Sequence, residues 1–167
     1  MVSQRLVNLV GALGVALSDG QRRAMGEASG LADTEAAAVN VIGLEPGRSI
    51  ASVRVALAIT HPGTVRVVDR LVARGLVERR AGVDGRTVGL HLTAEGEGAF
   101  TAQLAAREGW LAPFAEALGP GGEALLDRLL GLTTGTDEDG EHLCRLCDDR
   151  VCPQDRCPVT LAVGKDP

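Results

Sequence analysis

The stretch that decides the fold runs from Ser49 to Thr93 and reads SIASVRVALAITHPGTVRVVDRLVARGLVERRAGVDGRTVGLHLT. In two parts of it, apolar residues recur at the three- and four-residue spacing of a helix. They are Ile50, Val53, Ala56 and Leu57 in the first part, and Val65, Val68, Leu71 and Val72 in the second. About three residues separate the two predicted helices, so the helices must cross sharply, as in a helix-turn-helix.

The second predicted helix has recognisable ends. Thr60 is a suitable N-cap, and Gly75 ends the helix. Pro62 is tolerated in the first turn because its missing amide hydrogen would have no partner there. We therefore expect a helix over roughly residues 60–74. The face opposite its apolar stripe carries Thr64, Arg66, Arg70 and Arg74.

A charged hairpin is expected directly after this helix. Residues 76–80 and 87–92 have the pattern of two short strands, and Gly82 and Gly85 give the connection between them its turn freedom. A hairpin in this place is a wing, whose Arg-bearing tip can lie along a minor groove of DNA while the preceding helix enters the major groove.

Four short motifs follow one another here: Asp69-Arg70-Leu71, Gly75-Leu76-Val77-Glu78-Arg79, Asp84-Gly85-Arg86 and Leu92-Thr93-Ala94-Glu95-Gly96. In this order they resemble the signature of the MarR family of winged helix-turn-helix repressors, strongly over residues 57–98 and by architecture over about 3–133. The resemblance implies a mainly α fold, with a two-stranded β wing and a helical dimerisation region formed by both ends of the chain. It further implies a homodimer that binds near-palindromic double-stranded DNA.

The local charge agrees with a DNA-binding module. The whole chain has a formal net charge of -5, but residues 48–91 carry eight arginines against three acidic residues, a local excess of positive charge. A basic module on an acidic body can place one face on phosphates while the rest is repelled. A solvated Arg-rich face on an unrelated helical domain is the alternative interpretation.

Individual roles follow from position. Side chains at the start of the second helix can reach base edges, and these are Thr60, His61, Thr64 and Arg66. His61 could instead stay solvated there. Arg70, Arg79 and Arg80 are expected to contact phosphates or form structural ion pairs. Arg86 resembles the family's wing arginine, and Asp84 is expected to orient it through a charge-assisted hydrogen bond.

The flanking segments predict further helices. Leu6, Leu9, Leu13 and Leu17 have amphipathic spacing, and Thr93 can cap a long helix running to about Leu118. A further helix is expected over residues 123–132. Because a small winged domain cannot cover all this apolar surface, dimerisation is expected. The predicted division is residues 1–32 for an N-terminal dimerisation helix, 33–92 for the winged domain, 93–133 for C-terminal dimerisation helices, and 134–167 for a linker and tail.

Composition narrows the class of protein. A hydrophobic content of 45% is ample for folding, and 2% aromatic residues indicates a core of small aliphatic side chains. No unbroken apolar span and no convincing secretory signal are recognisable, which favours a cytoplasmic protein without membrane contact. Scattered histidines, with neither a phosphate loop nor a nucleophile motif, argue against an enzyme. Residues 133–140, TTGTDEDG, have the composition of a flexible linker.

All four cysteines fall near the C-terminus, at Cys144, Cys147, Cys152 and Cys157. The spacing C-x2-C-x4-C-x4-C predicts a tetrahedral thiolate site, since stable disulfides are rare in a reducing cytosol. Zn²⁺ is the favoured metal, while an iron-sulfur cluster and metal-free redox thiols stay open. His142 could serve as another ligand or be a solvated histidine.

The sequence therefore predicts a DNA-binding transcriptional regulator, expected to be a repressor, with a metal-bound tail that is structural or senses metal or redox state. The family resemblance also implies a small-molecule inducer, in a pocket that Phe100, Trp110 and Phe114 could line unless they are plain core. The alternative is a metal-binding electron carrier or protein-interaction module.

Overall fold

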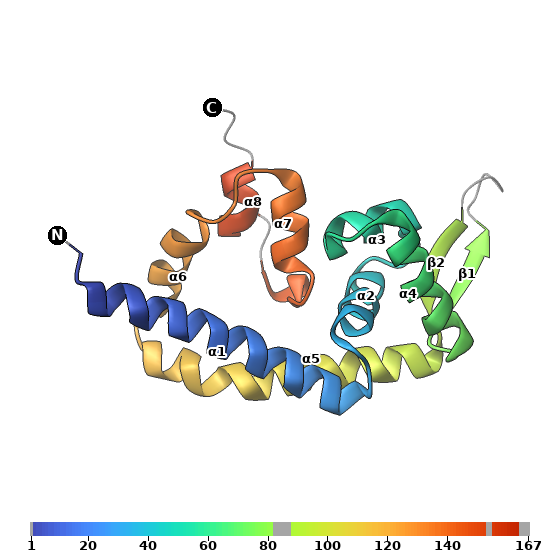
Figure 1. Ribbon diagram of the computed structural model, residues 1–167, viewed down its shortest axis with the longest axis horizontal. Helices are drawn as coiled ribbons and strands as arrows, with labels where there is room; N and C mark the ends of the chain where they lie inside the picture. The colour runs from blue at the N-terminus through green and yellow to red at the C-terminus, as the bar shows by residue number, and fades with distance from the viewer. Residues whose placement is uncertain (1, 82–87, 153–154, 164–167) are drawn as a thin grey trace.

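A computed structural model of the 167-residue chain describes residues 2–81, 88–152 and 155–163. Eight α-helices, one short 3-10 helix and one β-hairpin are present in these ranges (Figure 1). Their bounds are α1 Gln4–Ser29, α2 Asp33–Leu44, α3 Ile50–Leu57, α4 His61–Ala73, β1 Val77–Ala81, β2 Val88–Leu92, α5 Ala94–Leu118, α6 Gly122–Leu130, α7 Asp137–Cys144, η1 Asp149–Val151 and α8 Pro158–Val163. The expected mainly helical fold with a two-stranded wing is confirmed.

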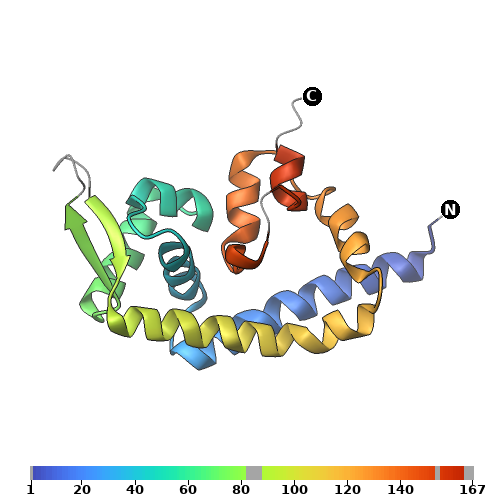
Figure 2. The same ribbon diagram turned by 180° about the vertical axis from the view of Figure 1, so that it is seen from behind.

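The two long helices form the base of the molecule. Helices α1 and α5 pack side by side, and α2, α3, α4 and the hairpin lie together over one end of that base (Figures 1 and 2). We call residues 33–92 the reading head. Helices α6, α7 and α8 return over the other end, so that α7 lies against α3. The described residues 134–152 and 155–163 are called the cysteine tail.

The hydrophobic core lies mainly inside the reading head. Small aliphatic side chains of α2, α3 and α4 fill it, and Phe100 closes it from α5. In α4 the buried positions are Thr64, Val67, Val68 and Leu71. The sequence pattern predicts Val65 in this stripe, but Val67 is buried in its place. Burying this apolar surface is the main contribution to the stability of the head.

Side-chain caps begin the two helices of the helix-turn-helix. The Ser49 Oγ accepts a hydrogen bond from Ser52 N, and the Thr60 Oγ1 accepts one from Gly63 N at 3.3 Å. Between them the chain turns through Ala58, which has a φ of 52°. Helix α4 ends at Arg74 and Gly75, whose φ is 71°. The limits expected for α4 are therefore confirmed.

The wing is an antiparallel pair in which Val77 faces Leu92 and Ala81 faces Val88. Leu90 and Leu92 point into the core, while Arg79 and Arg80 on β1 are exposed. Asp84 and Arg86, the predicted residues of the wing tip, lie outside the described residues.

The expected linker over residues 133–140 is wrong in its second half. Thr136 caps α7, its Oγ1 accepts a hydrogen bond from Asp139 N, and the Asp139 carboxylate accepts one in return from Thr136 N at 3.0 Å. This capping box turns the acidic residues into the first turn of a helix, where carboxylates face the positive end of the helix dipole.

In the described ranges, no helix combines the length and the apolar character that crossing a lipid bilayer requires.

Candidate nucleic-acid interface and cysteine cavity

The exposed start of α4 forms the candidate DNA-reading surface. The side chains of His61 and Arg66 are exposed, and Thr60 sits at the same end as the N-cap. This is where a recognition helix presents side chains to base edges in the major groove. Three of the four predicted base-reading residues are therefore exposed, at the N-cap or in the first half of α4.

Thr64 is the exception, and its predicted role in base reading is wrong. Its side chain is completely buried, and its hydroxyl donates a hydrogen bond to the backbone oxygen of Thr60 at 3.2 Å. Thr64 lies one turn before Val68, on the face of α4 that packs into the core. Thr64 thus secures the first turn of the helix from inside.

Arg70 and Arg74 clamp α4 onto α2. Arg70 Nε donates to Glu35 Oε1 at 2.7 Å, and Arg74 Nη1 donates to Glu35 Oε2 at 3.1 Å. Glu35 is only 7% exposed, so its carboxylate depends on these two partners for its charge to be compensated. Of the two roles predicted for Arg70, the structure shows the ion pair.

Arg79 and Arg80 also form ion pairs. Arg79 Nη2 donates to Asp69 Oδ1 at 2.7 Å and so joins the wing to α4, while Arg80 pairs with Glu78 on the same strand. Both pairs are largely exposed, and exposed pairs break at little cost when a phosphate is offered. Their guanidinium groups thus remain suitable for phosphate contacts.

The final motif of the signature joins the hairpin to α5. The Thr93 hydroxyl donates to the Gly75 backbone oxygen at 2.6 Å, and its oxygen accepts from Gly96 N at 3.1 Å. Gly96 also packs so closely on the Leu76 backbone oxygen that a Cβ there would come within 2.0 Å of it. The threonine and glycine of the Leu-Thr-x-x-Gly motif are therefore needed for backbone packing.

The four cysteines of the tail line one cavity of about 530 Å³. Its other walls come from α2, from Arg48, and from Leu130 of α6. The Cys144 and Cys147 thiols are hydrogen-bonded to each other, and Arg107 Nη2 of α5 lies 3.7 Å from Cys147 Sγ. Residues far apart in the sequence thus line the same open pocket as the thiols.

The surroundings favour a thiolate at Cys147. The hydrogen bond from Cys144 lowers the pKa of Cys147 to about 6, and the charges of Arg107 and Arg145 act in the same direction against burial. The same hydrogen bond, with burial, raises the pKa of Cys144, and burial raises the pKa of Cys152. Positive charge beside a thiolate is the setting that metal ligation and thiol chemistry both require.

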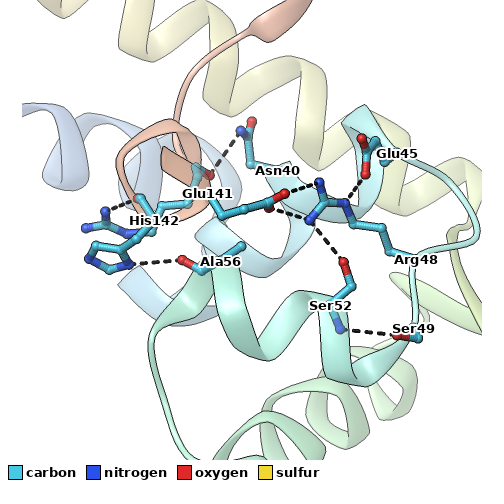
Figure 3. Close-up of polar contacts among 9 residues, drawn as sticks. Asn40, Glu45, Arg48, Ser49, Ser52, Ala56, Glu141 and His142 are labelled. Atoms are coloured by element: carbon cyan, nitrogen blue, oxygen red, sulfur yellow. Dashed lines mark hydrogen bonds and ion pairs between the residues drawn. The ribbon is translucent and has the colours of Figure 1, made fainter. Parts of the chain in front are cut away.

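The tail is fastened to the reading head by polar contacts (Figure 3). Glu141 of α7 accepts hydrogen bonds from Arg48 Nη1 at 2.7 Å and Nη2 at 3.3 Å. His142 Nδ1 lies 3.0 Å from the backbone oxygen of Ala56, and His142 is not one of the described residues that line the cysteine cavity. Asn40 of α2 donates from Nδ2 to the backbone oxygens of Arg145 and Cys147, at 3.1 and 2.8 Å.

Arg48 is the centre of this contact. Burial alone would lower the pKa of Arg48, but its hydrogen bonds to Glu141 and Glu45 raise the pKa above its ordinary value. The Arg48 side chain is 15% exposed and reaches Ser52 Oγ as well. The guanidinium therefore stays charged and bridges α7 to the start of α3.

Four residues that matter for the tail were missed from the sequence: Asn40, Arg48, Arg107 and Glu141. Two signals were available. Asn40 interrupts the apolar run AAAVNVIG of α2, and a polar residue there needs a partner. The Thr136-x-x-Asp139 pattern marks a helix start just before Cys144. The pairing of Arg48 with Glu141, far apart in sequence, has no local signal.

The aromatic residues considered for an inducer pocket are divided between two places. Phe100 lies in the head core, with the Arg150 guanidinium 5.3 Å from the centre of its ring. Trp110 packs on Phe114, with ring centres 5.6 Å apart, and rests against Gly20 of α1. Phe100 is thus core, Trp110 belongs to the contact of α5 with α1, and Phe114 packs on Trp110.

These features define a winged helix-turn-helix domain carried on two long helices. Residues 29–87, which span most of this domain, match the model of the MarR family. The chain has the fold of MarR-family regulators, a winged helix-turn-helix. No curated protein sequence matches it significantly.

Solved structures share this fold. The MarR repressor of Listeria monocytogenes is 25% identical, with 75% of this chain and 87% of that one covered and a TM-score of 0.52. A Mycobacterium tuberculosis MarR-family protein in complex with p-aminosalicylic acid is 24% identical, with 72% and 94% covered and a TM-score of 0.54. Streptococcus pneumoniae FabT in complex with DNA is 18% identical, with 76% and 91% covered and a TM-score of 0.62.

Proposed function

We propose that this chain is a sequence-specific DNA-binding transcriptional regulator, a repressor that binds a near-palindromic operator as a homodimer. The observation that carries the proposal is the exposure of His61 and Arg66 in the first half of α4, together with the exposed Arg79 and Arg80 on the wing strand β1. FabT, which shares the fold, was solved bound to DNA, and this supports the same use of the surface here.

Dimerisation follows from apolar side chains that one copy leaves uncovered. The N-terminal half of α1 and the outer face of α6 expose large aliphatic residues, among them Leu6, Leu9, Val10, Leu13, Leu125, Leu126 and Leu129. A second copy would bury both surfaces and set the two reading heads about one DNA turn apart. Light scattering at micromolar concentration tests this, and a monomer mass would contradict it.

The experiment on DNA reading compares two variants on a selected operator and on random DNA. Arg66→Ala should change base preference because Arg66 lies at the base-reading end of α4. Arg86→Ala should weaken binding to all sequences and reduce the salt dependence by about one phosphate contact. If Arg86→Ala bound both DNAs as the parent does, the wing assignment would fail.

We further propose that Cys144, Cys147, Cys152 and Cys157 bind a metal, with Zn²⁺ favoured over an iron-sulfur cluster. All four line one cavity, and Arg107 and Arg145 offset the negative charge of a four-thiolate zinc site. Within the described ranges, no three His, Cys, Asp or Glu side chains stand in a metal-binding arrangement. Metal binding would therefore draw Cys152 and Cys157 toward the pair that is already in contact.

Metal and acid-labile sulfide analysis of protein purified without oxygen decides between the two metals. About one zinc per chain without visible absorbance indicates a structural site. Iron with sulfide and a brown colour indicates a sensing site.

A small-molecule inducer also belongs to this proposal, because a MarR-family protein with the same fold was solved with p-aminosalicylic acid.

A further inference from the structure

The cysteine tail contacts α3 near both of its ends. Glu141 holds Arg48, the residue before the N-cap Ser49, and His142 contacts the backbone oxygen of Ala56 in the last turn. Two consecutive residues of α7 therefore span the length of α3 (Figure 3). Any shift of α7 must either move α3 or break these contacts.

A third contact holds the loop between Cys144 and Cys147. The Asn40 amide donates to the backbone oxygens of Arg145 and Cys147, on either side of Leu146. Asn40 is completely buried and Leu146 is 8% exposed, so this loop is seated in the core of the reading head. The backbone that carries two of the thiols thus takes its position from α2.

The tail has little stability of its own. Helix α7 has eight residues and α8 has six, whereas isolated helices shorter than about 12–15 residues are marginal in water. A metal bound by thiolates would supply folding energy to such a segment. The metal and the reading head would then order the same loop. Ordering of the loop by one of them would lower the conformational entropy cost of binding for the other.

We propose that Asn40 and Arg48 are positioning residues of the metal site, and that zinc binding is thereby coupled to the order of α3 in the helix-turn-helix. The proposal rests on the metal site and the DNA-binding function proposed above. The zinc-loaded protein is the tighter DNA binder, because a reading head that is already ordered loses less conformational entropy on binding.

Hydrogen exchange of the full chain tests the coupling without DNA. Metal-free protein is compared with protein given one equivalent of Zn²⁺, and exchange is followed in peptides covering residues 50–57. Zinc should slow exchange in α3 by about tenfold in the parent protein. In Glu141→Ala the slowing should fall to about twofold or less, while zinc still binds.

Glu138→Ala is the matched control. Glu138 lies on the same helix, is exposed, and has no ion pair among the contacts of the described residues. Alanine has the highest helix propensity, so neither substitution lowers the helix propensity of α7, and Glu138→Ala additionally removes one carboxylate from the positive end of the helix. The control should keep the full zinc effect. Equal α3 exchange with and without zinc in the parent, or an undiminished effect in Glu141→Ala, would overturn the coupling.

Operator binding gives the second measurement. Zinc should tighten operator binding by about fivefold, and the operator should tighten zinc binding by the same factor, since such coupling is reciprocal. In Glu141→Ala both factors should approach one. Operator affinity that ignores zinc, or falls with zinc, contradicts the proposal.

The two measurements separate the possible failures. A parent protein that binds zinc and protects α3 but retards no DNA would refute the regulator function and leave the coupling supported. A parent that binds operator but takes up no zinc would refute the metal site, and the coupling with it.

Discussion

The reading head and the cysteine tail are joined in one molecule but are stabilised in different ways. The head encloses completely buried side chains such as Val53, Val68 and Leu71. Of the described tail residues, Leu146 is the one that joins this core, and most other attachments of the tail are polar, among them the hydrogen bonds and ion pair made with Asn40, Arg48 and Ala56. A hydrophobic core tolerates the loss of a single surface contact, whereas a segment held by few polar contacts does not. The tail is therefore the part of the molecule that can be released.

Metal removal should produce the largest difference in stability between the head and the tail. With a chelator stronger than the thiolate site, the tail should lose its order, because metal binding at four-cysteine sites contributes about 10 kcal/mol or more of folding energy. The head should remain folded on its own core. Limited proteolysis with mass spectrometry should then show cuts only after about residue 133. Cuts of equal rate in residues 33–92 would contradict the difference between the regions.

The same substitution in each region sharpens the contrast. Leu71→Ala removes a completely buried side chain from the head and should lower the free energy of unfolding by about 2–5 kcal/mol. Leu146→Ala should leave the unfolding midpoint of the head nearly unchanged while it loosens the tail. Urea denaturation followed by circular dichroism measures the first effect, and proteolysis of residues 134–163 the second. A larger loss of global stability in Leu146→Ala would reverse the comparison.

A glycine pair within α5 tests how tightly the head is packed on its base. In Gly96→Ala the new Cβ would meet the Leu76 backbone oxygen, so overpacking should cost about 1–3 kcal/mol. Gly98 has open space around it, and Gly98→Ala should stabilise the helix by about 0.5–1 kcal/mol. Thermal unfolding of both variants gives the result. Equal unfolding temperatures of Gly96→Ala and Gly98→Ala would mean that Gly96 is not closely packed at the junction between β2 and α5.

The smallest expected effect is confined to the start of α7. Thr136→Ala removes the capping-box acceptor for Asp139 N and should cost about 1 kcal/mol of local stability. Hydrogen exchange in residues 137–144 should quicken by about fivefold while α2 and α4 are unchanged. Ser49→Ala is the matched loss of a helix cap within the head. Because α3 is also held by the hydrophobic core, its hydrogen exchange should stay nearly as slow as in the parent protein. Faster hydrogen exchange confined to α3 in both variants would contradict this prediction.

Much of the reading head could be predicted because its signals are local. The caps at Thr60 and Thr93 and the glycine after α4 are each recognisable within a few residues. The structure also explains two motifs physically, since Asp69 pairs with Arg79 and Gly96 packs on the Leu76 backbone. Spacing alone misplaced Thr64, because the first turn of α4 already faces the core.

The grouping of the four cysteines could be predicted from the sequence, but the packing of the tail could not. The clustered cysteines indicated a common site, and all four line one cavity. Its attachment to α2 and α3 joins residues about a hundred positions apart, and such pairs leave no periodic signal in the sequence. Polarity over residues 133–140 suggested a linker because acidic first turns and linkers share the same composition.

Trp110 gives the protein an internal optical probe. It is the one tryptophan of a chain that contains no tyrosine, and it lies where α5 crosses Gly20 of α1. Trp110 is 37% exposed, so its emission wavelength should respond to any separation of these two helices and to their burial by another molecule. Fluorescence of the unlabelled protein would therefore report events at the base, while the reading head stays spectroscopically silent.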